Sequence, residues 1–311
     1  MSGMVEHYCD RLNDAVRRCG TPAVVGLDPV IEYLPPLLRP RDRRAESAAR
    51  AVSAFCRGVI NAVAPHVPAV KINIGFFEPF YGAGIEAYGQ TVAYAHERGL
   101  LVIGDVKRGD IGSTAALYAR AHLDDPAFED IDPARVPDAI TLAPYMGAGA
   151  MRPFIETAAR LGRGLYLLVR PSDPGADEVH EFGEGPRFYE HLADLVHRWG
   201  FSEELLGRCG LSCVGAVVAP KDAESTQALR ELLPHTPLLV PGYGAQGATM
   251  EACRPLFRAD GTGAVVNASR SVIYAYNQPR FALRAPEDWT SAVEEAAREF
   301  ASDAGRALEP A

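Results

Sequence analysis

The chain contains 311 residues, of which 48% are hydrophobic and 23% are charged, a composition typical of a globular enzyme and not of a disordered chain. Its formal net charge of −9 at pH 7 argues against nonspecific binding to nucleic acid or to an anionic membrane surface, because both carry negative charge themselves. The length suits either two ordinary domains or one large α/β barrel.

The first segment, at about residues 4–19, is predicted to be an amphipathic helix with Val5, Tyr8, Leu12 and Val16 on one face. This is not the pattern of a signal peptide, and no apolar run reaches the roughly 18 residues that a membrane span needs. The six cysteines are scattered without the spacing of a zinc site, so reduced, structural thiols are expected. These features predict a cytoplasmic protein without a metal site.

Eight short runs rich in β-branched residues follow, and each ends in glycine, proline or a polar residue. Segments with helical periodicity lie between them, for example 48–63 and 188–199. Strands apolar enough to be buried on both faces and alternating with helices predict a parallel, eight-stranded (β/α)8 TIM barrel. The predicted strands are 23–29, 69–75, 100–107, 139–144, 164–170, 214–220, 237–242 and 264–269.

The barrel is expected to form one domain over residues 1–311, although a doubly wound open sheet has the same alternation and stays open as an alternative. Two long connections, 121–138 and 171–213, are expected to carry extra loops, the second over the active-site face. A C-terminal helical extension is expected at about 285–305, where the Glu-rich segment 289–301 is most simply a surface cap.

Charged and amide side chains occur at the carboxyl ends of the first three predicted strands, where barrels build their active sites. Asp28 ends the first strand, Lys71 and Asn73 lie in the second, and Asp105 and Lys107 end the third. Because side chains alternate along a strand, Asp105 and Lys107 should point to the same side. A structural ion-pair network is the alternative, but four charges from three strands favour a catalytic site.

Asp110 and Thr114 follow the third strand and are four residues apart. If a helix began at Asp110, the two side chains would share one face of its first turn. Considered alone, Asp110 could equally be the N-cap of that helix. The two interpretations remain open at this point.

A glycine-rich segment at 241–247, which includes Gly244, follows the seventh predicted strand, and Arg270 follows the eighth. Glycine lets backbone N–H groups approach an anion, and arginine can hold a phosphate with two hydrogen bonds. Loops after these two strands commonly bind phosphate in barrels, so a phosphorylated small molecule is the predicted ligand. Residues 242–247 also fit a dinucleotide fingerprint, but no acid follows at the required distance, and we regard that match as a decoy.

Together these motifs resemble the orotidine 5′-phosphate decarboxylase family, and the longer loops resemble its second bacterial subfamily. The resemblance covers about residues 5–280. Its motifs are 26–29 (GLDP), 71–78 (KINIGFFE), 105–114 (DVKRGDIGST), 241–247 (PGYGAQG) and 269–271 (SRS).

The resemblance implies a homodimeric (β/α)8 barrel that converts orotidine 5′-monophosphate to UMP and CO2 without a cofactor or a metal. Lys107 would protonate C6 of the pyrimidine, and Asp105 would lie beside the departing carboxylate. The resemblance also implies that Asp28 and Lys71 bind the ribose and that Gln246 and Arg270 bind the phosphate. Asp110 and Thr114 would enter the neighbouring subunit's site.

One position departs from the family pattern. The family usually has a polar residue near the pyrimidine where this chain has Ala143, so either Thr141 or a backbone group makes that contact, or base recognition is weaker. Two other functions would require different residues. A metal-dependent sugar-phosphate decarboxylase or aldolase would place a metal-binding acid where this chain has Lys71, and a catalytically inactive phosphate-binding barrel would not need Asp105, Lys107 and Asp110.

Overall fold

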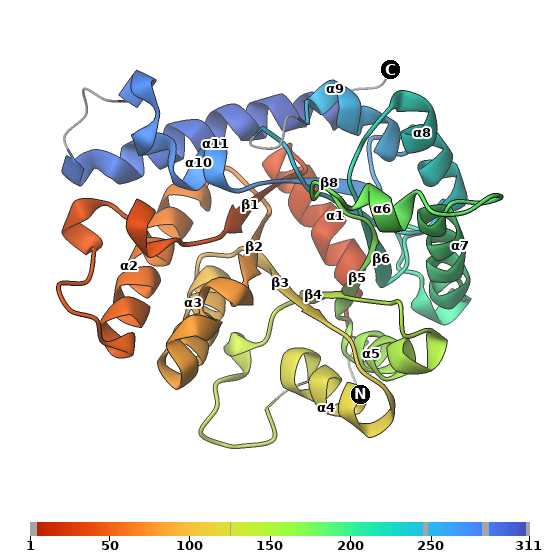
Figure 1. The fold of residues 1–311 in the computed structure, drawn as a ribbon, viewed down its shortest axis with the longest axis horizontal. Coiled ribbons are helices and arrows are strands. Elements are labelled where there is room, and N and C mark those ends of the chain that lie inside the picture. The colour runs from red at the N-terminus through yellow and green to blue at the C-terminus, as the bar shows by residue number, and fades with distance from the viewer. Residues whose placement is uncertain (1–4, 125, 245–247, 282–285, 309–311) are drawn as a thin grey trace.

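The computed structural model describes residues 5–124, 126–244, 248–281 and 286–308. Within these residues, eight parallel strands close into a barrel in chain order, as predicted (Figure 1). The first strand pairs with both the second and the eighth, which excludes the open doubly wound sheet. The strands are β1 Ala23–Leu27, β2 Ala69–Asn73, β3 Leu101–Arg108, β4 Ala139–Leu142, β5 Gly164–Arg170, β6 Val214–Val218, β7 Leu238–Val240 and β8 Ala264–Ala268.

Helices surround the strands (Figure 1), and short 3-10 turns connect several of them. Within the described residues, no helix is long and apolar enough to cross a membrane. The helices are α1 Tyr8–Cys19, α2 Ala45–Val63, α3 Tyr81–Glu97, α4 Gly112–Leu123, α5 Ala148–Leu161, α6 Asp177–His180, α7 Phe188–Gly200, α8 Ala223–Leu232, α9 Met250–Cys253, α10 Arg270–Ile273 and α11 Trp289–Gly305.

The start of α1 differs from the sequence prediction. The helix begins at Tyr8, and not at about residue 4, because His7 has an extended backbone and its imidazole accepts a hydrogen bond from the N–H of Cys9. This N-cap interaction fixes the start of the helix after His7, so Val5 is not part of it. Val5 therefore lies outside the helix and is 57% exposed, whereas Tyr8 and Leu12 are buried as predicted.

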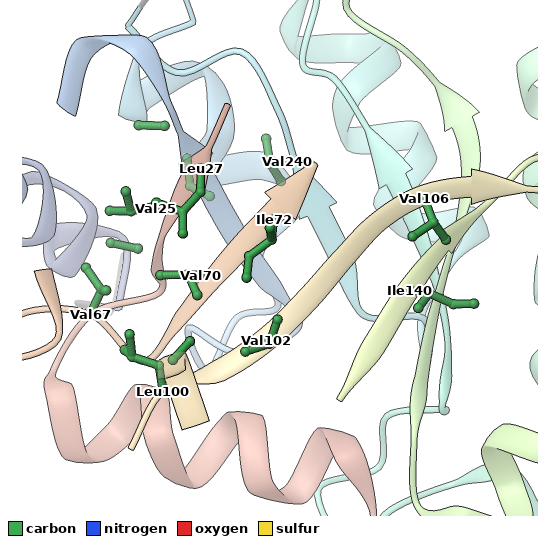
Figure 2. Close-up of a cluster of buried hydrophobic side chains, with 14 of the residues drawn as sticks. Val25, Leu27, Val67, Val70, Ile72, Leu100, Val102, Val106, Ile140 and Val240 are labelled. Carbon is green, nitrogen blue, oxygen red and sulfur yellow. The ribbon is translucent and has the colours of Figure 1, made fainter. Parts of the chain in front are cut away.

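Two apolar layers hold the barrel together. One fills the interior of the barrel, where Val24, Ile103 and Val265 pack against Tyr8 and Leu12 of α1. The other lies between the strands and the outer helices (Figure 2), and its labelled members are Val25, Leu27, Val67, Val70, Ile72, Leu100, Val102, Val106, Ile140 and Val240. Neighbouring residues therefore point to opposite faces along each strand, as the period of a β-strand requires.

The long connections lie where the sequence predicted them. Residues 126–138 form an excursion before β4, and residues 171–187 form a loop that contains the short helix α6. The C-terminal helix α11 packs along α2 and α10 on the outside of the barrel (Figure 1). The carboxyl ends of the strands are left for the loops that build the site.

Candidate active site

A pocket of about 640 Å³ lies at the carboxyl ends of the strands. This volume is in the range of small-molecule sites and suits a mononucleotide. Polar side chains from β1, β2 and β3 and from the segments after β5 and β8 face it. Its lining includes Asp28, Lys71, Asn73, Asp105, Lys107, Thr141, Ser172, Asp173, Asn267, Ser269 and Arg270.

The charged residues of the first three strands form one connected array. The ammonium nitrogen of Lys71 lies 2.7 Å from Oδ2 of Asp105 and 3.8 Å from Oδ1 of Asp28. The ammonium nitrogen of Lys107 lies 2.5 Å from the other carboxylate oxygen of Asp105. Thr141 donates a hydrogen bond of 2.8 Å to that same oxygen. Asp105 is thus held by two cations and one hydroxyl.

Burial and charge act in opposite directions in this array. Burial would raise the pKa of Asp105, but the charges of Lys71 and Lys107 outweigh it, and the pKa lies well below its usual range. Burial would lower the pKa of Lys71, but the carboxylates of Asp105 and Asp28 outweigh it, and that pKa is raised. The carboxylate and the ammonium group therefore both stay charged at neutral pH.

Lys107 differs from its neighbours in backbone and exposure. Its φ of 43° lies in the left-handed region, and the pairing of β3 with β4 shifts register between Gly104 and Arg108. The N–H of Lys107 donates to the hydroxyl of Thr141, at 3.0 Å, instead of to a strand carbonyl. This bulge presents the Lys107 side chain, 48% exposed, to the pocket on the same side as Asp105, as predicted.

The wall of the pocket is polar on one side and apolar on the other. Lys71, Asp105 and Thr141 come from β2, β3 and β4, whereas Leu168, Val217 and Leu239 come from β5, β6 and β7. A ligand with a charged or polar edge and a flat apolar face would match this division.

The segments after β7 and β8 form the other end of the pocket, through Gly242, Tyr243, Ser269 and Arg270. The predicted ligand Gln246 lies outside the described residues. Gly244 does not line the pocket itself, but its φ of 74° lies in the left-handed region that favours glycine. Arg270 supplies a cation to this part of the pocket, as a phosphorylated ligand would need.

Asp110 and Thr114 do not line this pocket. Helix α4 begins at Gly112, its N-cap residue is Ile111, and the carboxylate of Asp110 accepts a hydrogen bond from the N–H of Ile111. The N-cap interpretation of Asp110 was therefore wrong. Thr114 is exposed on the first turn of α4.

Several pocket residues were not among the predicted ligands. Ser172 and Asp173 follow β5 directly, and Tyr33 and Asn267 complete the wall. A sequence signal was present for the first two, because polar residues after a barrel strand point to the active-site end. Thr141 is bound to Asp105 and Lys107, so its hydroxyl has little capacity left for a base.

Arg170, at the end of β5, fixes the segment that carries Ser172. Its guanidinium is fully buried and donates to the carbonyl of Ala219 at 2.9 Å. It also donates to the hydroxyls of Ser225 at 3.0 Å and Thr226 at 3.1 Å. The carboxyl ends of β5 and β6 are thereby joined beside the pocket.

No group of three or more His, Cys, Asp or Glu side chains within the described residues could hold a metal ion. Between the carboxylates of Asp28 and Asp105 lies the ammonium group of Lys71. A cation is therefore already supplied by the chain at the position where two acids from neighbouring strands converge.

Comparison with known proteins gives the family. Residues 25–285 match the model of the orotidine 5′-phosphate decarboxylase / HUMPS family. One relative named orotidine 5′-phosphate decarboxylase, from Rhodopirellula baltica, is 39% identical over 92% of this chain and 95% of its own length. Another relative of that name, from Clostridium novyi, is 35% identical over 86% of this chain and 89% of its own length. The solved structure of Leishmania donovani OMP decarboxylase is 26% identical, with a TM-score of 0.73 over 99% of this chain and 100% of that one. The chain belongs to the orotidine 5′-phosphate decarboxylase / HUMPS family.

Proposed function

We propose that this chain decarboxylates orotidine 5′-monophosphate to UMP and CO2, the last step of de novo UMP synthesis. The observation that carries the proposal is the array of Asp28, Lys71, Asp105 and Lys107 in a mononucleotide-sized pocket that Arg270 also lines. Family membership supports the same reaction. The motifs also favour the second bacterial subfamily.

In the proposed mechanism, the bond between C6 and the carboxylate breaks, CO2 leaves, and the electron pair stays on C6. Lys107 stabilises this negative charge and then transfers a proton from its ammonium group to C6, which gives UMP. The neutral amine takes a proton from solvent before the next turnover. Because Lys107 is half exposed and held by Asp105, it is both positioned for transfer and open to reprotonation.

Asp105 is proposed to lie beside the substrate carboxylate. Its charge is maintained by the pKa shift described above, so the two carboxylates repel each other before CO2 leaves. Binding energy from the distant phosphate would hold the substrate against this repulsion. Asp28 and Lys71 are proposed to bind ribose hydroxyls, and Arg270, Gln246 and the backbone of Gly244 to bind the phosphate.

The ring is proposed to lie over the apolar wall of Leu168, Val217 and Leu239, where its face would be shielded from water. Ser172 and Asp173, at the edge of that wall, offer the polar groups that Ala143 lacks. They are the candidates for recognising the pyrimidine edge.

A homodimer is proposed, with Asp110 and Thr114 completing the neighbouring subunit's site. Both lie outside their own pocket, and the surface around them is apolar: Ile111 and Leu117 are each 64% exposed, and Tyr145 is 71% exposed. An exposed apolar patch of this kind is typical of a subunit interface. All six cysteines are free thiols, which supports the proposal of a cytoplasmic location.

The alternative of a metal-dependent sugar-phosphate enzyme is less well supported, because Lys71 stands where that chemistry would place a metal-binding acid. The test follows the loss of orotidine 5′-monophosphate absorbance by the purified chain, with and without EDTA. The proposal predicts equal turnover in both, with UMP and CO2 as products. Turnover that EDTA abolishes would favour the metal-dependent enzyme, and no turnover would favour an inactive binding barrel.

A further inference from the structure

The C-terminal helix α11 contacts the phosphate end of the pocket through one side chain. Tyr243, in the segment after β7, lines the pocket, and its hydroxyl donates a hydrogen bond to Oδ2 of Asp303 on α11. Its ring also packs on Phe300, one turn earlier on the same helix, with centroids 4.8 Å apart. Sixty residues of chain separate Tyr243 from Asp303, so the contact is tertiary.

The carboxylate of Asp303 is itself fixed. Its other oxygen, Oδ1, forms an ion pair with Arg306, which lies one turn further along. Asp303 is only 23% exposed at its side chain, and hydrogen bonds to an ionised acceptor are stronger than those between neutral groups. Asp303 therefore holds the tyrosine hydroxyl from a rigid helix.

Backbone hydrogen bonds connect Gly242 and Gly244, on either side of Tyr243, with Ala248. The N–H of Gly244 donates to the carbonyl of Ala248 at 3.1 Å, and the N–H of Ala248 donates to the carbonyl of Gly242 at 3.3 Å. The side chain of Tyr243 adds a contact with α11, on the outside of the barrel.

We infer that Asp303 is a positioning residue for the phosphate end of the site, which acts by holding Tyr243 and thereby setting where the backbone of the adjacent Gly242 meets the ligand. The inference rests on the proposed function, because it assumes that this end binds a phosphate. Fixing the segment before binding reduces the entropy lost when the ligand binds. Helix α11 then contributes to ligand affinity and is more than a surface cap.

The test compares the affinities of UMP and uridine by calorimetry, because their ratio isolates the contribution of the phosphate. Tyr243→Phe and Asp303→Ala should each weaken UMP binding about tenfold and leave uridine binding unchanged within about twofold. The double variant should be no weaker than either single variant, since all three lose the same bond. Asp303→Asn, which keeps an acceptor oxygen, should restore most of the affinity.

Glu294→Gln is the matched control, because Glu294 lies on the same helix, its side chain is 56% exposed, and it pairs with His66 at 3.4 Å. It should bind UMP as the wild type does. In turnover assays, Asp303→Ala should raise KM more than it lowers kcat.

Equal weakening of UMP and uridine, or additive losses in the double variant, would overturn the inference. If the wild type turns over its substrate and both single variants bind UMP with unaltered affinity, the inference is overturned too, and the proposed function stands. Absence of turnover in the wild type would instead contradict the proposed function, while the UMP-to-uridine ratio still decides the role of Asp303.

Discussion

The ammonium nitrogen of Lys107 lies 2.5 Å from Oδ1 of Asp105, two residues earlier on the same strand. A regular strand would already place these two side chains on one face. The backbone of Lys107 is left-handed instead of extended, and in this conformation its side chain turns back onto the carboxylate. The second oxygen of Asp105 is held by Lys71. One carboxylate thus orients both lysines of the site.

Stability in acid should depend on Asp138, which lies just before β4 at the end of the barrel opposite the pocket. Burial would raise its pKa, but hydrogen bonds from His96 and Arg11 lower it to about 2. Because the folded pKa lies below the unfolded value, Asp138 stabilises the fold above about pH 4, and this contribution of about 2–3 kcal/mol is lost as the pH falls toward 2.

Asp138→Asn should therefore be destabilised at pH 7 in urea unfolding and should lose less further stability than the wild type between pH 5 and 3. Asp130→Asn, a change in the exposed excursion before β4, is the control and should follow the wild type. Parallel curves for Asp138→Asn and the wild type would contradict the assignment.

Arg170→Met should lower the free energy of unfolding by about 2–4 kcal/mol, because the acceptors on Ala219 and Thr226 would stay buried without their donor and the bond to Ser225 would be lost. Arg170→Lys keeps the charge but not the planar fork, so it should recover only part of this loss. Chemical denaturation measures both. If Arg170→Met were as stable as the wild type, the guanidinium would not be what joins β5 to β6.

The shared site predicts complementation between two inactive chains. Asp110→Ala and Lys107→Ala should each be inactive alone. When subunits exchange, a heterodimer contains one site with both defects and one with neither, so mixing should restore up to about a quarter of wild-type activity for random pairing. Tagged subunits would demonstrate exchange, and exchange without recovery would place Asp110 in its own subunit's site.

The barrel could be predicted from sequence because each strand is a short apolar run that ends in glycine, proline or a polar residue. The predicted starts of β1, β2, β4, β5, β6 and β8 coincide with the observed ones. The charged array could also be predicted, since Asp28, Lys71 and Asp105 all sit at strand ends and parallel strands bring those ends together.

Other features depend on contacts between distant segments, which no local pattern carries. The bulge at Lys107 arises where β3 shifts register against β4, and Arg170 is buried only because the turn after β6 supplies its acceptors. The same holds for Asp303, whose partner Tyr243 is remote in the chain. Ser172 was not among the predicted ligands, although a polar residue close after a barrel strand is a local signal.

The most direct test of the account is the turnover of Lys107→Ala with saturating orotidine 5′-monophosphate, measured beside its affinity for UMP. The account predicts that kcat falls at least about a thousandfold, because both the proton donor and the charge facing C6 are lost, while UMP still binds. Lys221→Ala, which removes a lysine paired with Asp177 and Glu181, should keep wild-type kcat. Near-normal kcat in Lys107→Ala would contradict its role as the proton donor.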